Sequence, residues 1–202
     1  MYDVLAKGGP LMIPIAVAGV LALAIFLERL WFLRHEKIIP RRLIDAVLDL
    51  VKKDKYSEAE VLCRQDRSIV SVVLRVGVTH AKKGRRQIKD IMEESGKSVA
   101  AELERYVNGL GTIAAVSPLM GLLGTVTGMI NVFQKVTSEG VGDPRLLASG
   151  IWEALVTTAA GLTVAIPAYI AYRYLLGKVD GLLLEMEEAA IETVDAITVE
   201  DE

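Results

Sequence analysis

The sequence has a single cysteine, two histidines and none of the common catalytic motifs in its 202 residues. Cys63 alone excludes a disulfide within the chain, and its place in a polar part of the sequence favours an inert cytoplasmic thiol. Glycine-rich phosphate loops, paired metal ligands and nucleophile elbows are all lacking. His35 and His80 are isolated in polar segments, which favours the surface for both. We therefore predict no enzyme activity, no cofactor and no metal.

Charge is missing from three long stretches of the chain, although the net charge is only −3. Residues 8–27 and 106–134 carry no charged side chain, and residues 146–172 carry only Glu153. About 20 apolar residues at ~1.5 Å per residue cross a ~30 Å hydrocarbon core as a helix. The sequence therefore predicts an integral membrane protein with three transmembrane helices and a modest soluble part.

The first apolar stretch resembles a signal peptide in length, and it contains small-residue patterns typical of cleavage sites. A signal peptide has its positive residues before the apolar run, whereas here they follow it. They are Arg29, Arg34, Lys37, Arg41 and Arg42. Positive charge gathers on the cytoplasmic side of a membrane, so we expect the N-terminus outside and the C-terminus inside.

These observations predict an all-α protein whose long helices extend into a helical cytoplasmic domain. We expect an N-terminal periplasmic segment with transmembrane helix 1 in residues 1–33, and the cytoplasmic helical domain in 34–105. Transmembrane helix 2 should occupy 106–134 and a short periplasmic loop 135–145. Transmembrane helix 3 should occupy 146–174, followed by a cytoplasmic C-terminal helix and acidic tail in 175–202.

Within the cytoplasmic part, Pro40 should end one helix and residues 41–53 should form an amphipathic one. Ser57 and Glu60 have the spacing of a capping box, with Ser57 as the N-cap. From residue 87 a helical pattern runs into the second membrane stretch without a strong breaker before Pro118, where we expect a kink. The basic turn at residues 82–86 fits a solvated turn or a contact with lipid headgroups; without interleaved aromatic residues, it does not indicate nucleic acid.

Small and weakly polar residues form stripes on the second and third membrane helices. The stripes contain Ser117, Gly121, Thr125 and Gly128, then Ala154, Thr158, Gly161 and Ala165, and Gly124 widens the first of them. Such stripes are typical of close helix packing, and threonine there often bonds to carbonyls of its own helix. They are also suited to lining an aqueous or proton-conducting seam. Pro167 is better explained as a kink than as a ligand.

Glu153 is the one acid inside a membrane stretch. An ionised carboxylate there is costly, so it should face the protein interior or a wet cavity and is a functional candidate; a structural carboxyl bonded to neighbouring helices is the alternative. Thr157 lies one helical turn further on the same face, and its hydroxyl can both donate and accept a hydrogen bond. Thr158 lies about 140° from that face.

Several of these motifs together resemble the MotA/TolQ/ExbB proton-channel family. They are GLLGTV at 121–126, GM at 128–129, EALVTTAAGLTVAIPA at 153–168 and ERLW at 28–31. The resemblance covers essentially the whole chain, and three spans resemble the ExbB/TolQ branch. The family's pore threonines fall on Thr125 and Thr158 and its third-helix acid falls on Glu153, with Thr157 kept as a second choice by helical geometry.

The resemblance implies a homopentamer in the bacterial inner membrane that surrounds an ExbD/TolR-like dimer of single-span partners. Its implied function is a stator subunit of a motor driven by proton motive force, acting through a TonB/TolA-like protein on outer-membrane transport or envelope maintenance. Membrane lipids are the other implied contact. A non-conducting scaffold that assembles and stabilises its partners is the alternative, because small-residue stripes also serve packing alone.

Overall fold

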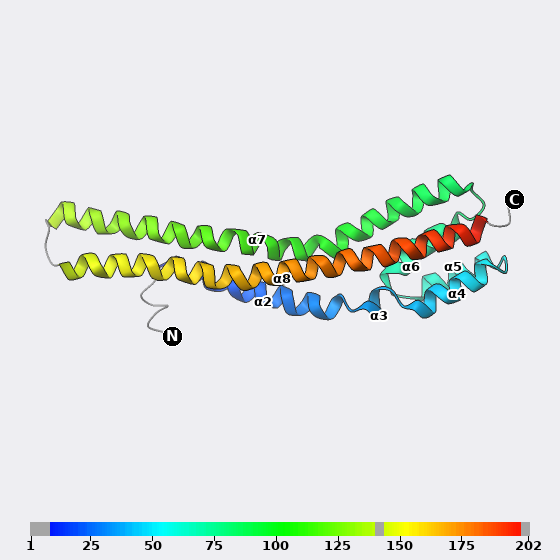
Figure 1. The fold of residues 1–202 in the computed structure, drawn as a ribbon, viewed down its shortest axis with the longest axis horizontal. Coiled ribbons are helices and arrows are strands. Elements are labelled where there is room, and N and C mark those ends of the chain that lie inside the picture. The colour runs from blue at the N-terminus through cyan, green and yellow to red at the C-terminus, as the bar shows by residue number, and fades with distance from the viewer. Residues whose placement is uncertain (1–8, 140–143, 199–202) are drawn as a thin grey trace. The chain divides into compact units, whose positions relative to one another are not determined.

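The computed structural model describes residues 9–139 and 144–198, and its regular elements there are all helices (Figure 1). They are α2 (Met12–Phe32), α3 (His35–Ile38), α4 (Arg41–Val51), α5 (Tyr56–Gln65), α6 (Ile69–Thr79), α7 (Arg85–Glu139) and α8 (Pro144–Thr198). The predicted all-α class is confirmed for this part of the chain.

Three of the described helices, α2, α7 and α8, are long and apolar enough to cross a membrane. At ~1.5 Å per residue the 55 residues of α7, and likewise of α8, measure ~80 Å, far more than the ~30 Å hydrocarbon core. Each of these two helices therefore extends well beyond its apolar part, as the sequence predicts. Gly177 and Gly181 do not end α8, and Pro118 lies inside α7.

The chain divides into two compact units, and α7 and α8 contribute to both. The first unit, here the apolar unit, combines the chain up to Glu28 with Tyr106–Tyr174. The second, here the polar unit, combines Arg29–Arg105 with the chain from Leu175 onward.

In the apolar unit, α2 packs closely against α8. A Cβ placed on Gly19 would lie 3.2 Å from a methyl of Val164, so the helices meet where glycine leaves room. Many large apolar side chains of this unit remain exposed on the outside, for example Leu122, Phe133 and Ile166. An exposed apolar surface of this extent suits lipid and neighbouring subunits better than water.

In the polar unit, the short helices build a core with α7 up to Arg105 and with α8 from Leu175 onward. Helix α4 buries Leu43, Val47 and Val51, spaced four residues apart, which confirms the predicted amphipathic helix. Helix α5 packs against both α4 and α6. The described part of α8 adds buried apolar residues at steps of three or four, with one step of five between the fifth and sixth; they are Leu175, Val179, Leu182, Met186, Ala189, Val194 and Ile197.

The predicted capping box is wrong. Helix α5 begins at Tyr56 with Lys55 as its N-cap residue, so Ser57 already lies in the first turn. A tight turn causes this shift: Asp54 has a φ of 59°, and the Lys55 amide donates to the Leu50 carbonyl. Glu60 pairs with Arg64 at 3.1 Å, further along α5.

Candidate functional site

The small residues of α7 and α8 meet directly in the apolar unit. A Cβ on Gly161 would lie 2.6 Å from the Ser117 carbonyl oxygen, and one on Gly121 would lie 2.9 Å from Cα of Thr158. Real Cβ atoms essentially never come so close to other heavy atoms. The two backbones therefore touch at these glycines, which is how small residues let membrane helices associate.

The buried stripe on α7 differs from the predicted one by one member. It contains the buried Ser117, Gly121 and Gly124, and the half-buried Gly128, on which an added Cβ would lie 3.1 Å from Cβ of Ala154; Thr125 is also half-buried but lies beside the stripe. Steps of four, three and four residues keep side chains within a narrow angle on a helix, while two consecutive steps of four rotate Thr125 outward by about 80° from Ser117. Thr125 thus borders the contact instead of filling it.

Thr157 lies inside the helix contact. Its side chain is 1% exposed, and a Cβ on Gly124 would collide with its methyl group. Its hydroxyl donates to the Glu153 carbonyl at 2.9 Å, as the Ser117 hydroxyl does to the Ile113 carbonyl at 2.7 Å. These two hydroxyls are bonded within their own helices.

Thr158 makes a hydrogen bond that connects the two helices. Its hydroxyl donates to the Gly121 carbonyl at 2.8 Å, across the hairpin, and its side chain is half-buried. The Thr125 hydroxyl donates to the Leu122 carbonyl at 2.7 Å in its own helix. Both hydroxyl oxygens keep lone pairs that can accept a hydrogen bond from a water or a protonated acid.

Glu153 is half-buried and lies beside the start of α2. A Cβ on Gly9 would lie 2.5 Å from Oε1 of Glu153, so the carboxylate reaches the backbone just before Met12. Gly9 has a φ of +69°, a conformation that side-chain-bearing residues rarely adopt. The sequence did not single out Gly9, because the contact joins residues 144 positions apart.

The remaining predicted residues of α8 divide between the interior and the surface. Ala165 is buried, and Pro167 is exposed. Among the described residues no cluster of three or more His, Cys, Asp or Glu side chains is arranged to hold a metal ion. The chemistry this site offers is therefore that of hydroxyls, backbone carbonyls and one carboxylate.

Comparisons of the sequence with known proteins indicate its family. Residues 65–188, more than half of the chain, match the model of the MotA/TolQ/ExbB proton channel family. The chain is 34% identical over 179 residues to the biopolymer transport protein ExbB-like 1 of Synechocystis, covering 87% of this chain and 70% of that protein. It is 30% identical to an ExbB homolog of Methanothermobacter thermautotrophicus, over 93% of this chain and 67% of that protein.

A third relative is more distant. The biopolymer transport protein ExbB of Pseudomonas putida is 28% identical over 91% of this chain, which spans 57% of that longer protein. The match to the family model contains both small-residue stripes and Glu153. This membrane protein therefore belongs to the MotA/TolQ/ExbB proton channel family.

Proposed function

We propose that this protein is an ExbB/TolQ-like stator subunit of the bacterial inner membrane. With an ExbD/TolR-like partner it forms a proton-conducting complex that uses proton motive force for outer-membrane transport or envelope maintenance. The observation that carries the proposal is Glu153, a half-buried carboxylate in an otherwise uncharged, membrane-length part of α8. Such an acid is costly in a membrane unless it has a functional or wet environment.

In this proposal the chain crosses the membrane three times, with the N-terminus outside. The basic residues after α2 support this orientation, because positive charge gathers on the cytoplasmic side. The polar unit then lies in the cytoplasm. Five copies surround two single-span partners, and a TonB/TolA-like protein transmits force to the outer membrane.

The geometry supports distinct roles for the four polar residues. The Thr158 hydroxyl bonds α8 to α7 and Thr157 packs against Gly124 of α7, so both threonines fix the wall of the path. Thr125, half-buried at the edge of the contact, and the free lone pairs of Thr158 offer hydroxyl oxygens to a water or to a partner's carboxyl group. Glu153 offers the charge that attracts a proton toward this wall.

The tight contact between α7 and α8 also favours the second candidate, a non-conducting scaffold. Ser117, Gly121, Gly124 and Gly128 are used in packing, and packing alone explains their size. A scaffold does not explain why Glu153 lies in the uncharged part of α8.

The two candidates are separated by proton flux into liposomes that contain this chain with its co-expressed single-span partner. We expect partner-dependent flux that falls in Thr125→Val and in Thr158→Val, because each change removes a hydroxyl at nearly constant volume. Matched assembly is checked by the yield of the complex. Equal flux in wild type and both variants would refute the pore assignment and favour the scaffold.

A further inference from the structure

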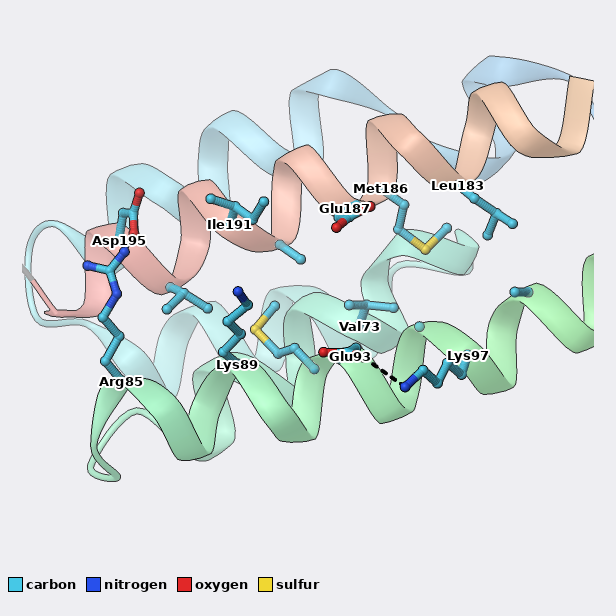
Figure 2. A pocket seen from close by; sticks show the side chains of 15 residues that line it. Val73, Arg85, Lys89, Glu93, Lys97, Leu183, Met186, Glu187, Ile191 and Asp195 are labelled. Atoms are coloured by element: carbon cyan, nitrogen blue, oxygen red, sulfur yellow. Dashed lines mark hydrogen bonds and ion pairs between the residues drawn. The ribbon is translucent and has the colours of Figure 1, made fainter.

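The polar unit contains an apolar groove that the proposed proton path does not use. Its volume is about 470 Å³, and it lies between α7 and α8, with Val73 of α6 also lining it (Figure 2). Its apolar lining includes Met92, Ala100, Leu183, Met186 and Ile191. Methionine side chains adapt their shape to what they contact, which suits a binding surface.

The groove is incompletely filled by the chain itself. Gly96 lines it, and a Cβ placed on Gly96 would meet nothing within 4 Å. A glycine inside a helix weakens the helix relative to alanine, and no close neighbour among the described residues requires one here. Ile191 lines the same groove and is 46% exposed. Both observations indicate room for an apolar side chain from outside.

The α7 wall of the groove is mainly basic, with Arg85, Lys89 and a Lys97 that pairs with Glu93 at 2.7 Å, whereas the α8 wall is acidic, with Glu187 and Asp195. At one end Arg85 of α7 pairs with Asp195 of α8 at 2.5 Å. Lys89 on α7 and Glu187 on α8 lie on the groove side of their helices, and neither makes an ion pair or hydrogen bond with the described residues (Figure 2). An occupant that fits must therefore present an acid toward α7 and a base toward α8. An anionic lipid headgroup would satisfy Lys89 and be repelled by Glu187.

The polar unit also has exposed apolar residues that do not line the groove, here called the Val61–Val72 ridge. It consists of Val61 on α5 and Val72 on α6, which are 53% and 42% exposed. Helices α5 and α6 pack together and are joined by only three residues, which makes them antiparallel neighbours. Val61 lies four residues before the end of α5 and Val72 three after the start of α6, so they are at about the same level. Beside Val61, Glu60 and Arg64 supply one charge of each sign.

We propose that the groove of one copy receives the Val61–Val72 ridge of a second copy of this chain, with Arg64 directed toward Glu187 and Glu60 toward Lys89. The contact joins two different faces, so it is heterologous and repeats from copy to copy until a ring closes. This contact rests on the proposed function, in which several copies of the chain assemble, and it names the two faces through which they would do so.

Leu184 on α8 is the competing ridge, because it is 60% exposed. Its neighbours one helical turn away on α8 include Asp180, Glu187 and Glu188, all acidic. An acidic ridge would be repelled by Glu187 in the groove of the next copy. Charge complementarity therefore favours Val61 and Val72.

Disulfide trapping tests the contact in the assembled complex. Two differently tagged full-length copies, one carrying Val61→Cys and the other Ile191→Cys, are co-expressed with the partner subunit, and the membranes are oxidised. We expect a linked product that carries both tags, and none from either variant alone. Glu94→Cys, exposed on α7 and outside the groove, replaces Ile191→Cys as the matched control. The native Cys63 is buried and stays in every variant, with wild type as its control.

Several outcomes would overturn the proposal. One is a disulfide between two copies that both carry Val61→Cys. Another is that Leu184→Cys links to Ile191→Cys while Val61→Cys does not. The third is that no disulfide forms although the complex has the wild-type mass.

Charge exchange adds a second readout: Glu187→Arg and Arg64→Glu should each reduce linkage several-fold, and together they should restore it. Failure of the restoration refutes the charge pairing. Linkage without proton flux would refute the proposed function and keep the contact.

Discussion

The Thr158 hydroxyl donates to the Gly121 carbonyl at 2.8 Å, which makes it a hydrogen bond between two helices that also touch at their backbones. Within α7 that carbonyl still accepts the amide of residue 125 as part of the helix. Thr158 therefore adds a second donor and does not rescue an unsatisfied group.

The first prediction concerns this bond. Thr158→Val should destabilise the purified protein by about 1 kcal/mol, because a single hydrogen bond contributes about that much and the Gly121 carbonyl keeps its helical partner. Thr158→Ser keeps the hydroxyl and should retain most of that stability. Thermal unfolding in detergent measures both. A valine variant as stable as the wild type would show that the bond contributes nothing, and a loss confined to the serine variant would assign the stability to the methyl group.

The second prediction separates close-contact glycines from open ones. Gly161→Ala should cost about 1–3 kcal/mol, since its Cβ would lie 2.6 Å from a backbone oxygen that cannot rotate away. Gly109→Ala, on the same hairpin with nothing within 4 Å, should instead stabilise by up to ~1 kcal/mol because alanine favours helix. Unfolding in detergent measures the difference. Equal effects at the two positions would contradict the packing of α7 on α8.

Much of the fold follows from simple sequence signals. The uncharged stretches predict three membrane-length helices, and the spacing of Leu43, Val47 and Val51 predicts the buried face of α4. The family motifs identify the family correctly. These signals are local or repeat along one helix, so they need no knowledge of which segments meet.

The finer features depend on which segments meet, and the sequence does not reveal that. Thr157 and Thr158 are adjacent, and only the position of α7 places Thr157 inside the contact and Thr158 at its edge. Helix α5 begins at Tyr56, ahead of the cap expected at Ser57, because the chain turns at Asp54.

The third prediction concerns Cys63. Burial is the main reason why the pKa of this thiol rises from 9.0 to about 11, with a smaller contribution from the Asp66 carboxylate. At pH 8 the thiolate fraction is then about 100-fold lower than for an unperturbed thiol, so alkylation by iodoacetamide should be slow in the folded protein and fast after unfolding.

The same shift predicts a pH effect on stability. Between pH 9 and about 11 the folded state holds the thiol proton that the unfolded state has lost, so stability should fall as pH rises through that window. Alkylation rates measured from pH 8 to 10.5, with the Cys63→Ala variant as background, test the shift. Rapid labelling of the folded protein at pH 8 would contradict it.

The fourth prediction concerns Gly9, which leaves room for the carboxylate of Glu153. Gly9→Ala should displace that carboxylate, because the new Cβ would lie 2.5 Å from Oε1 and the backbone has a φ of +69°. If Glu153 guides proton entry, the pH profile of liposome flux should shift in Gly9→Ala in the same direction as in Glu153→Gln. Adding Glu153→Asp to Gly9→Ala shortens the acid and should bring the profile back toward wild type. An unchanged profile in an assembled Gly9→Ala complex would show that the position of the carboxylate does not matter to conduction, and Glu153 would then be a structural residue.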